Sequence, residues 1–115
     1  MTKIDDFKFG EMTIDGKTYY SDVMVWWDGK VELVEKPERH ELGINELAML
    51  MQGGPDIIVI GRGGESIIKI LPEFRQACRD KKIKLYSDPT PKAVEFFNGL
   101  CAQDKHVAAF FHMTC

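Results

Sequence analysis

The sequence has no long hydrophobic run. Its uninterrupted apolar stretches are short, such as residues 57–60 and 107–111, whereas a membrane-spanning helix needs roughly 20 apolar residues. The first six residues end in Asp5 and Asp6, where a secretory signal would carry a basic patch followed by an apolar segment. We therefore expect a cytoplasmic protein without a membrane span.

Cysteine is scarce and is not arranged for cross-linking. The three cysteines, Cys78, Cys101 and Cys115, are widely spaced and form no C-x-x-C motif. An odd number at such spacing favours reduced thiols over a disulfide framework. This pattern agrees with the expected compartment.

An excess of positive charge is also missing. The chain has 15 Lys and Arg against 18 Asp and Glu, a net charge of −3 at pH 7. Nucleic-acid binding requires a positive field, so DNA or RNA is excluded as the main partner. The bases that are present concentrate between Arg75 and Lys84, which indicates either a solvated helix end or a patch for an anionic partner.

What the chain does contain is enough apolar material for one core. It has 115 residues, of which 44% are hydrophobic, so disorder is excluded and a domain of this size buries most of its unfolded surface. We expect one domain over residues 1–115, without a cleft between two lobes.

The first third predicts antiparallel hairpins. Apolar and polar residues alternate, and Asp15-Gly16 and Asp28-Gly29 supply the turns, because Asp-Gly accepts the positive φ of a type I′ turn. We expect four short strands in a hairpin layer over about residues 7–35. A polar stretch with Pro37 then ends this layer.

The remainder, about residues 43–115, alternates helices with strands. Helices are expected from Ile44 to the Gly53-Gly54-Pro55 stop, from Pro72 to about Lys81, and from an N-cap at Thr90. Strands are expected at residues 56–61, 82–86 and 106–112, of which the first and last are continuous apolar runs typical of strands buried on both faces. The order predicts an α/β fold with a mixed sheet.

A glycine-rich loop follows the first of these buried strands and is the first candidate ligand site. It lies at the carboxyl end of the strand, where open α/β sheets bind ligands. Backbone N–H groups and the Arg62 guanidinium there could contact an anion, although a tight structural turn explains the same glycines. The candidate residues are Gly61, Arg62, Gly63, Gly64, Glu65 and Ser66.

Histidine and tryptophan supply the other candidates. His112 and Cys115 are spaced as His-x-x-Cys. Two ligands alone do not make a structural metal site. A buried histidine beside a terminal thiol, a metal-binding pair and a Cys/His nucleophilic pair all fit this spacing. His40 and Asp56 are interpreted as lone polar residues that hydrogen-bond or cap, and His106 is too far along its strand from His112 to share a metal with it. Trp26 and Trp27 are adjacent in a strand and point to opposite faces, so one of them is an interface candidate unless both are covered within the chain.

The ordered set of motifs resembles one family of small single-domain proteins. The motifs are His40-Glu41-Leu42, Pro55 to Gly63, Leu71-Pro72, Thr90 to Ala93, Phe97 to Leu100, and the ending Val107 to Cys115. This family includes the adipogenesis-associated domain protein and the mitochondrial complex I assembly factor 3, and the sequence is most similar to the adipogenesis-associated branch and its prokaryotic relatives.

The resemblance implies a fold and a role. It implies a three-layer β/β/α sandwich with a central mixed sheet and an N-terminal antiparallel hairpin layer, no cofactor, no established activity and no catalytic residue to transfer. Our first hypothesis is a non-enzymatic protein-binding or assembly module with an unidentified protein partner or self-association. The alternative is a small-ligand or anion-binding protein, or a weak enzyme, that uses Gly61 to Ser66.

Overall fold

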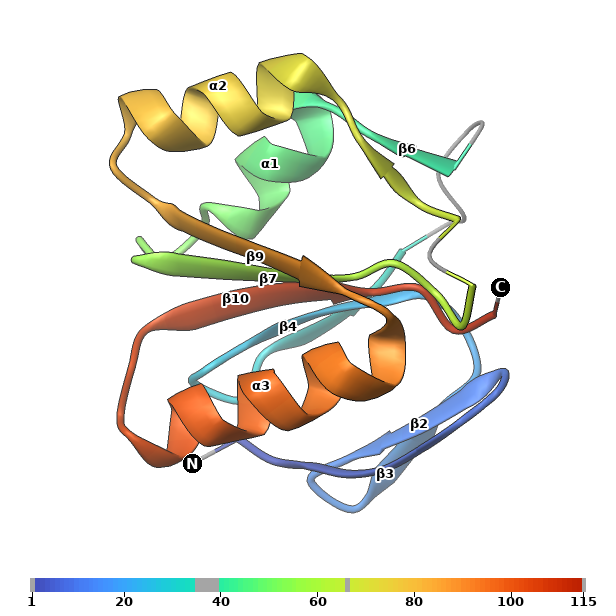
Figure 1. Cartoon of the computed structure of the whole chain (residues 1–115). Coiled ribbons are helices and arrows are strands. Elements are labelled where there is room, and N and C mark those ends of the chain that lie inside the picture. Colours follow the sequence, from blue (N-terminus) through green and yellow to red (C-terminus); the bar gives the residue numbers. More distant parts are fainter. Residues whose placement is uncertain (1, 35–39, 66, 115) are drawn as a thin grey trace.

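A computed structural model describes residues 2–34, 40–65 and 67–114 (Figure 1). The strands are β1 (Ile4–Lys8), β2 (Glu11–Ile14), β3 (Lys17–Tyr19), β4 (Val23–Trp26), β5 (Val31–Leu33), β6 (Glu41–Leu42), β7 (Ile57–Gly61), β8 (Lys69–Ile70), β9 (Lys84–Asp88) and β10 (Val107–Phe111). The helices are α1 (Ile44–Leu50), α2 (Pro72–Asp80) and α3 (Thr90–Ala102).

The central sheet has five strands in the order β5-β4-β10-β7-β9. β7 runs parallel to β10 and β9, whereas β4 is antiparallel to β10. Every residue of β7 and β10 is buried, because helices and a second sheet cover both faces. The two continuous apolar runs of the sequence are therefore the middle of a mixed sheet, as predicted.

The two faces of this sheet carry separate cores. On one face, Phe110 and Ile60 pack with Leu50 of α1 and Phe74 of α2. On the other face, Phe111 packs with side chains of α3 and of the three-stranded antiparallel sheet β1-β2-β3. Figure 1 shows α1 and α2 above the sheet, and α3 and the hairpin sheet below it. The predicted mixed α/β architecture with an antiparallel hairpin sheet is confirmed.

The hairpin layer is smaller than predicted. Five strands, not four, precede residue 34, and β4 and β5 belong to the central sheet. Only β1 to β3, residues 4–19, form the separate layer. The reason is the pairing of β4 with β10, in which Val23 lies opposite Phe111, a contact between distant segments that local turn signals do not reveal.

Two local predictions also need correction, and one pair of strands was not predicted. The strand predicted at residues 82–86 lies at residues 84–88. The N-cap of α3 is Pro89, and Thr90 is the first helical residue, whose hydroxyl bonds elsewhere. The two-residue parallel pair β6–β8 was not predicted. Within the described ranges, no helix is long and apolar enough to cross a membrane.

Candidate functional site

Several loops meet where β7 and β10 end, and we call this region the carboxyl edge. It consists of residues 20–22 before β4, residues 61–65 at and after the end of β7, and residues 112–114 after β10. These segments lie together because β7 and β10 are parallel and β4 starts opposite the end of β10. The predicted glycine loop and the predicted His112 therefore meet in one place.

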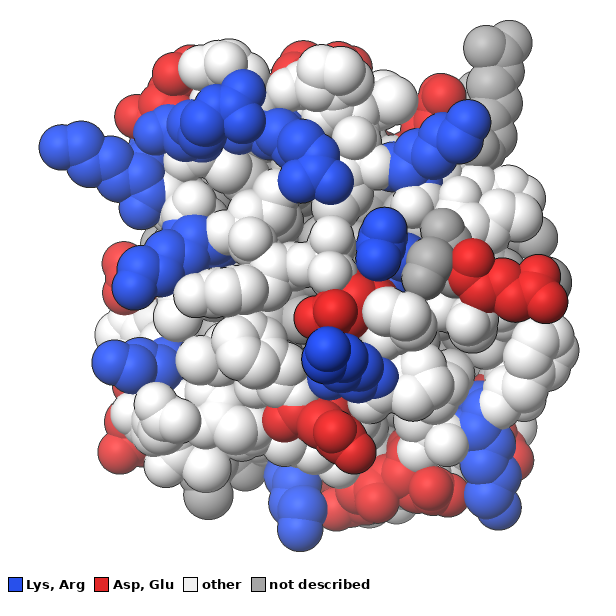
Figure 2. All heavy atoms as spheres, in the orientation of Figure 1, with Lys and Arg blue, Asp and Glu red and all other residues white. Residues whose placement is uncertain are grey.

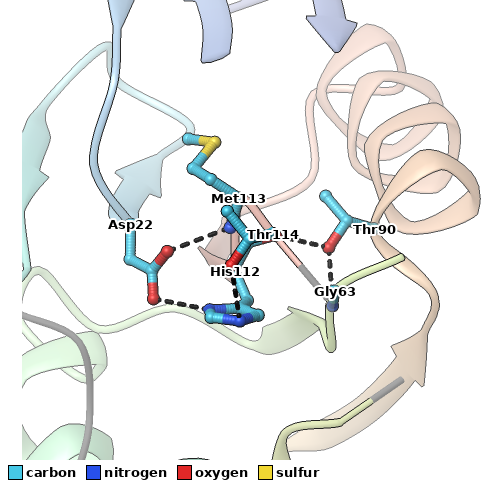
Figure 3. A network of polar contacts seen from close by, with 6 residues as sticks. All are labelled: Asp22, Gly63, Thr90, His112, Met113 and Thr114. Carbon is cyan, nitrogen blue, oxygen red and sulfur yellow. Dashed lines mark hydrogen bonds and ion pairs between the residues drawn. The ribbon is translucent and has the colours of Figure 1, made fainter. Parts of the chain in front are cut away.

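A buried acid–imidazole pair is the centre of this edge (Figure 3). His112 Nδ1 lies 2.8 Å from Asp22 Oδ2, and the side chains are 1% and 7% exposed. The other carboxylate oxygen, Oδ1, accepts the Met113 N–H at 2.9 Å. Since a carboxylate only accepts hydrogen bonds, Nδ1 carries a proton, and Nε2 faces the Thr114 hydroxyl at 3.3 Å.

The Thr90 hydroxyl connects this pair to the glycine loop. It donates to the His112 carbonyl oxygen at 2.8 Å and accepts the Gly63 N–H at the same distance. Thr90 is fully buried, so the hydroxyl is used as a fixed bridge between α3, β10 and the loop. This is why it does not cap its own helix.

The first glycine of the loop is required by packing. A Cβ at Gly61 would lie 2.8 Å from Phe111 Cδ1 and 3.0 Å from Thr90 Oγ1, closer than side-chain atoms approach one another. Gly61 thus allows α3 to begin directly against β7. Its glycine character has a structural explanation that needs no ligand.

The backbone donors of the loop are already used inside the chain. The N–H groups of Arg62, Gly63 and Gly64 donate to Asp88 O, Thr90 Oγ1 and Thr114 O. They are not free to surround an anion, as a phosphate-binding loop would require. Glu65 is exposed, and Ser66 lies outside the described residues.

The Arg62 side chain is the remaining ligand candidate of the loop. Its Nε is buried and has no hydrogen-bond partner among the described residues. A buried donor without an acceptor is unfavourable, so an acceptor on a bound molecule would stabilise it.

A shallow pocket opens beside the acid–imidazole pair. Its volume is about 290 Å³, at the lower end of the range for small-molecule sites. Asp22, His112 and Thr114 form its polar part, and Tyr20, Ser21, Val34 and Met113 complete its lining. His40 lies edge-on to the His112 ring with the centroids 5.6 Å apart.

The two tryptophans lie away from this pocket. Trp26 is 2% exposed and donates from Nε1 to Leu50 O, so it is not available to a partner. Trp27 is half-buried and stacks on His106, with ring centroids 4.7 Å apart. Trp27 is thus the one of the two that could still take part in an interface.

The thiols do not assemble a reactive or metal-binding centre in the described part of the chain. Burial raises the pKa of Cys78, and burial followed by the charge of Asp15 raises the pKa of Cys101 to about 11. Cys115 lies outside the described residues. Across the residues described, no three His, Cys, Asp or Glu side chains gather closely enough to hold a metal ion.

Sequence reasoning did not identify Asp22 or the bridging role of Thr90. Asp22 is 90 residues away from His112 in the chain, and no motif links them. The available signal was an acidic residue directly before the buried strand Val23–Trp26. It becomes meaningful only once the pairing of β4 with β10 is known.

Comparison with known proteins gives a family and several similar structures. Residues 4–112 match the family described as "Protein of unknown function (DUF498/DUF598)". The conserved hypothetical protein PH1505 from Pyrococcus horikoshii OT3 is 27% identical, with a TM-score of 0.88 over 98% of this chain and 99% of that chain.

Two further structures have the same fold. The protein MT938 is 25% identical, with a TM-score of 0.81 over 100% of both chains. An outer membrane protein from Bartonella henselae is 20% identical, with a TM-score of 0.84 over 99% of this chain and 96% of that chain. At this last identity the likeness concerns the fold alone.

Proposed function

The chain belongs to the DUF498/DUF598 family of proteins of unknown function, and on that premise we propose that it is a protein-binding module rather than an enzyme. The observation that carries the proposal is the position of its exposed apolar side chains. Among the described residues, the three most exposed large hydrophobic side chains are Phe9 (72%), Tyr20 (72%) and Leu33 (63%). Exposed apolar groups mark an interaction surface where they form a continuous patch, and we propose that these three side chains do so.

All three side chains belong to segments bonded to the carboxyl edge. Tyr20 itself lines the pocket. Gly10, which follows Phe9, donates its N–H to Met113 O, and Val34, which follows Leu33, donates to Asp22 O. The apolar groups are therefore attached to the segments that the acid–imidazole pair holds together.

The polar groups of the carboxyl edge support a bracing role. Both oxygens of Asp22, both ring nitrogens of His112 and the hydroxyl of Thr90 already have partners inside the chain. A catalytic base needs an atom free to accept a proton from substrate. Groups that are paired in this way fix the backbone of an edge, and a fixed edge binds a partner at lower entropic cost.

The partner we propose is a protein that presents an apolar segment to Phe9, Tyr20 and Leu33. Tyrosine is enriched among the residues that dominate interface energies, and an aromatic side chain loses little conformational entropy on binding. The cytoplasmic location and the adipogenesis-associated branch of the family, both expected from the sequence, remain parts of this proposal.

The test is capture of a partner from cell extract by the wild-type chain and by surface variants. We expect Phe9→Ser/Tyr20→Ser to lose the captured protein, and Ile44→Ser to retain it. Ile44 is a matched control because it is also an exposed apolar residue, at 49%, but lies on α1. Equal capture by all three proteins would overturn the proposal, as would a substrate turned over by the wild type.

A second candidate function is favoured by the unpartnered Arg62 Nε. In this alternative, the side chain contacts an anionic small molecule at the carboxyl edge. Inorganic phosphate and sulfate are suitable probes, and bound anion should raise the melting temperature of the wild type but not of Arg62→Ala. Absence of any shift in the wild type would remove this candidate.

A further inference from the structure

Strand β9 forms an open edge of the central sheet. The strand order ends at β9, which lies at the near edge of the sheet in Figure 1. The Lys84 N–H donates to Asp56 O, and the Arg62 N–H donates to Asp88 O. Both of these β9 residues therefore point their backbone polar groups toward β7.

The remaining backbone groups of β9 follow by alternation. The N–H and C=O of one strand residue point to the same side, and successive residues point to opposite sides. Tyr86 thus also faces β7, whereas Leu85 and Ser87 face outward. Their N–H and C=O groups have no partner from another element among the described residues.

The side chains of β9 form a self-complementary series. Lys84, Tyr86 and Asp88 share one face of the sheet, the face of α3, where Tyr86 packs edge-on against Phe96 with the centroids 4.6 Å apart. The strand thus presents a cation, an aromatic ring and an anion at equal spacing. A second copy laid antiparallel about Tyr86 places Lys84 opposite Asp88 twice.

We propose that β9 pairs with β9 of a second copy of this chain, antiparallel and centred on Tyr86. The outward backbone groups and the charged side chains of β9 are matched by the same register. In that register Leu85 lies opposite Ser87 of the second copy, so the outward groups form hydrogen-bonded pairs, and the Tyr86 residues form a non-hydrogen-bonded pair, in which side chains are closest. A two-fold axis makes both halves identical.

The surface around β9 suits this arrangement. Tyr86 is one of the exposed large hydrophobic residues. Beside it lies a hollow of about 270 Å³ lined by Asp88, Lys92, Glu95 and Phe96, which the second copy would partly fill. Figure 2 looks onto this face, and uncharged surface covers much of its middle. Pairing would also protect an edge that otherwise remains open to unspecific association.

The charged ends of β9 are available for the partner. Among the described residues, Lys84 has no carboxylate within 4.0 Å, and the cation near Asp88 is the exposed Lys92, whose Nζ is 3.9 Å from Asp88 Oδ1. An ion pair of this kind contributes little. If Asp88 pairs with Lys84 of the second copy instead of with Lys92, little stabilisation is therefore lost.

The test is sedimentation velocity over a concentration series up to about 1 mM, which covers weak association. The wild type should dimerise. Lys84→Asp and Asp88→Lys should each weaken dimerisation about ten-fold, because each variant places like charges opposite one another twice. An equimolar mixture of the two variants should form a heterodimer, since both opposing pairs are then of opposite charge. Lys17→Asp, the same charge change on β3, is the control and should dimerise like the wild type.

Hydrogen exchange provides the second measurement. The amides of Leu85 and Ser87 should exchange rapidly in dilute protein and become protected at high concentration, whereas the Tyr86 amide should be protected at both. A monomer throughout the series would overturn the proposal. So would a dimer that Lys84→Asp and Asp88→Lys leave unchanged, or concentration-dependent protection outside β9. None of these outcomes involves Phe9 or Tyr20, so they leave the carboxyl-edge proposal separately testable.

Discussion

At the scale of single residues, Asp22 holds the carboxyl edge together. Its two oxygens bind two consecutive residues, the ring of His112 and the backbone of Met113. Its own carbonyl oxygen accepts the Val34 N–H. One buried carboxylate thus fixes the end of β10 against the start of β4.

Replacing this carboxylate should be strongly destabilising. In Asp22→Ala, the buried His112 Nδ1 and Met113 N–H lose their acceptors, and we expect the free energy of unfolding to fall by about 3 kcal/mol. Chemical denaturation measures this loss. Asp6→Ala is the control: Asp6 is exposed, and its ion-pair partner among the described residues is Lys8 at 3.9 Å, so its change should stay below about 0.5 kcal/mol. Equal losses in the two variants would contradict the bracing role.

The buried thiol of Cys101 predicts a pH dependence. Its pKa is raised from 9.0 to about 11, first by burial and then by Asp15. Between these values the unfolded chain loses the thiol proton while the folded chain keeps it, so the stabilisation is complete below pH 9 and is lost as pH rises through 11.

The measurement is the unfolding free energy of the wild type and of Cys101→Ala from pH 8 to pH 11. Above pH 9 the wild type should lose up to about 1.4 kcal/mol per pH unit more than the variant. Lysines and tyrosines titrate in both proteins, so their contributions cancel when the unfolding free energy of the variant is subtracted from that of the wild type. Parallel pH profiles would show that the thiol does not titrate differently in the two states.

Sequence reasoning succeeded unevenly at this scale. It selected the glycine loop because the loop follows a predicted buried strand, and it selected His112 because His112 and Cys115 are spaced as His-x-x-Cys. It did not select Asp22, since no local pattern distinguishes an aspartate that meets His112 from one that faces solvent. The role of Thr90 was assigned incorrectly because helix-start statistics describe the helix alone, whereas its hydroxyl responds to β10 and the loop.

At the scale of elements, the contact between α3 and β7 depends on Gly61. Gly61→Ala would force its Cβ against Phe111 and Thr90, and such overpacking costs about 1 to 3 kcal/mol. Gly99→Ala is the matched change within α3, where the added Cβ meets nothing within 4 Å. It should stabilise the protein by up to about 1 kcal/mol, because alanine favours the helix.

Thermal and chemical unfolding of these two alanine variants should move in opposite directions. If Gly61→Ala is as stable as the wild type, the close approach is relieved by small shifts of Phe111. The glycine would then be explained better by a ligand than by packing.

The elements themselves were predictable where the signal is local. The apolar runs at β7 and β10 and the proline-marked starts of α2 and α3 identified their elements. The assignment of β4 and β5 to a sheet failed, because their hairpin looks the same whether it joins β3 or β10. Only burial on both faces of β4 separates these two cases, and burial is a property of the assembled fold.

At the scale of the whole molecule, the hairpin sheet is tied to α3 by Asn98. The Asn98 side chain accepts the Ile4 N–H at 2.8 Å and donates to Ile4 O at 2.9 Å. Ile4 and Ile14 of the hairpin pack into the same core as Phe97. One residue of α3 therefore supplies two hydrogen bonds between layers that are far apart in the sequence.

Loss of this tie should loosen the hairpin sheet more than the central sheet. In Asn98→Ala both backbone groups of Ile4 lose their partner, and we expect a loss of about 1 to 3 kcal/mol. Hydrogen exchange should be faster in β1 to β3 while β7 and β10 keep their protection, because the outer layer can open locally. Asn45→Ala, an exposed position on α1, is the control and should leave both sheets unchanged. If β7 and β10 lose protection together with β1 to β3, the layers unfold as one unit, and the tie contributes to global stability instead of docking the hairpin sheet.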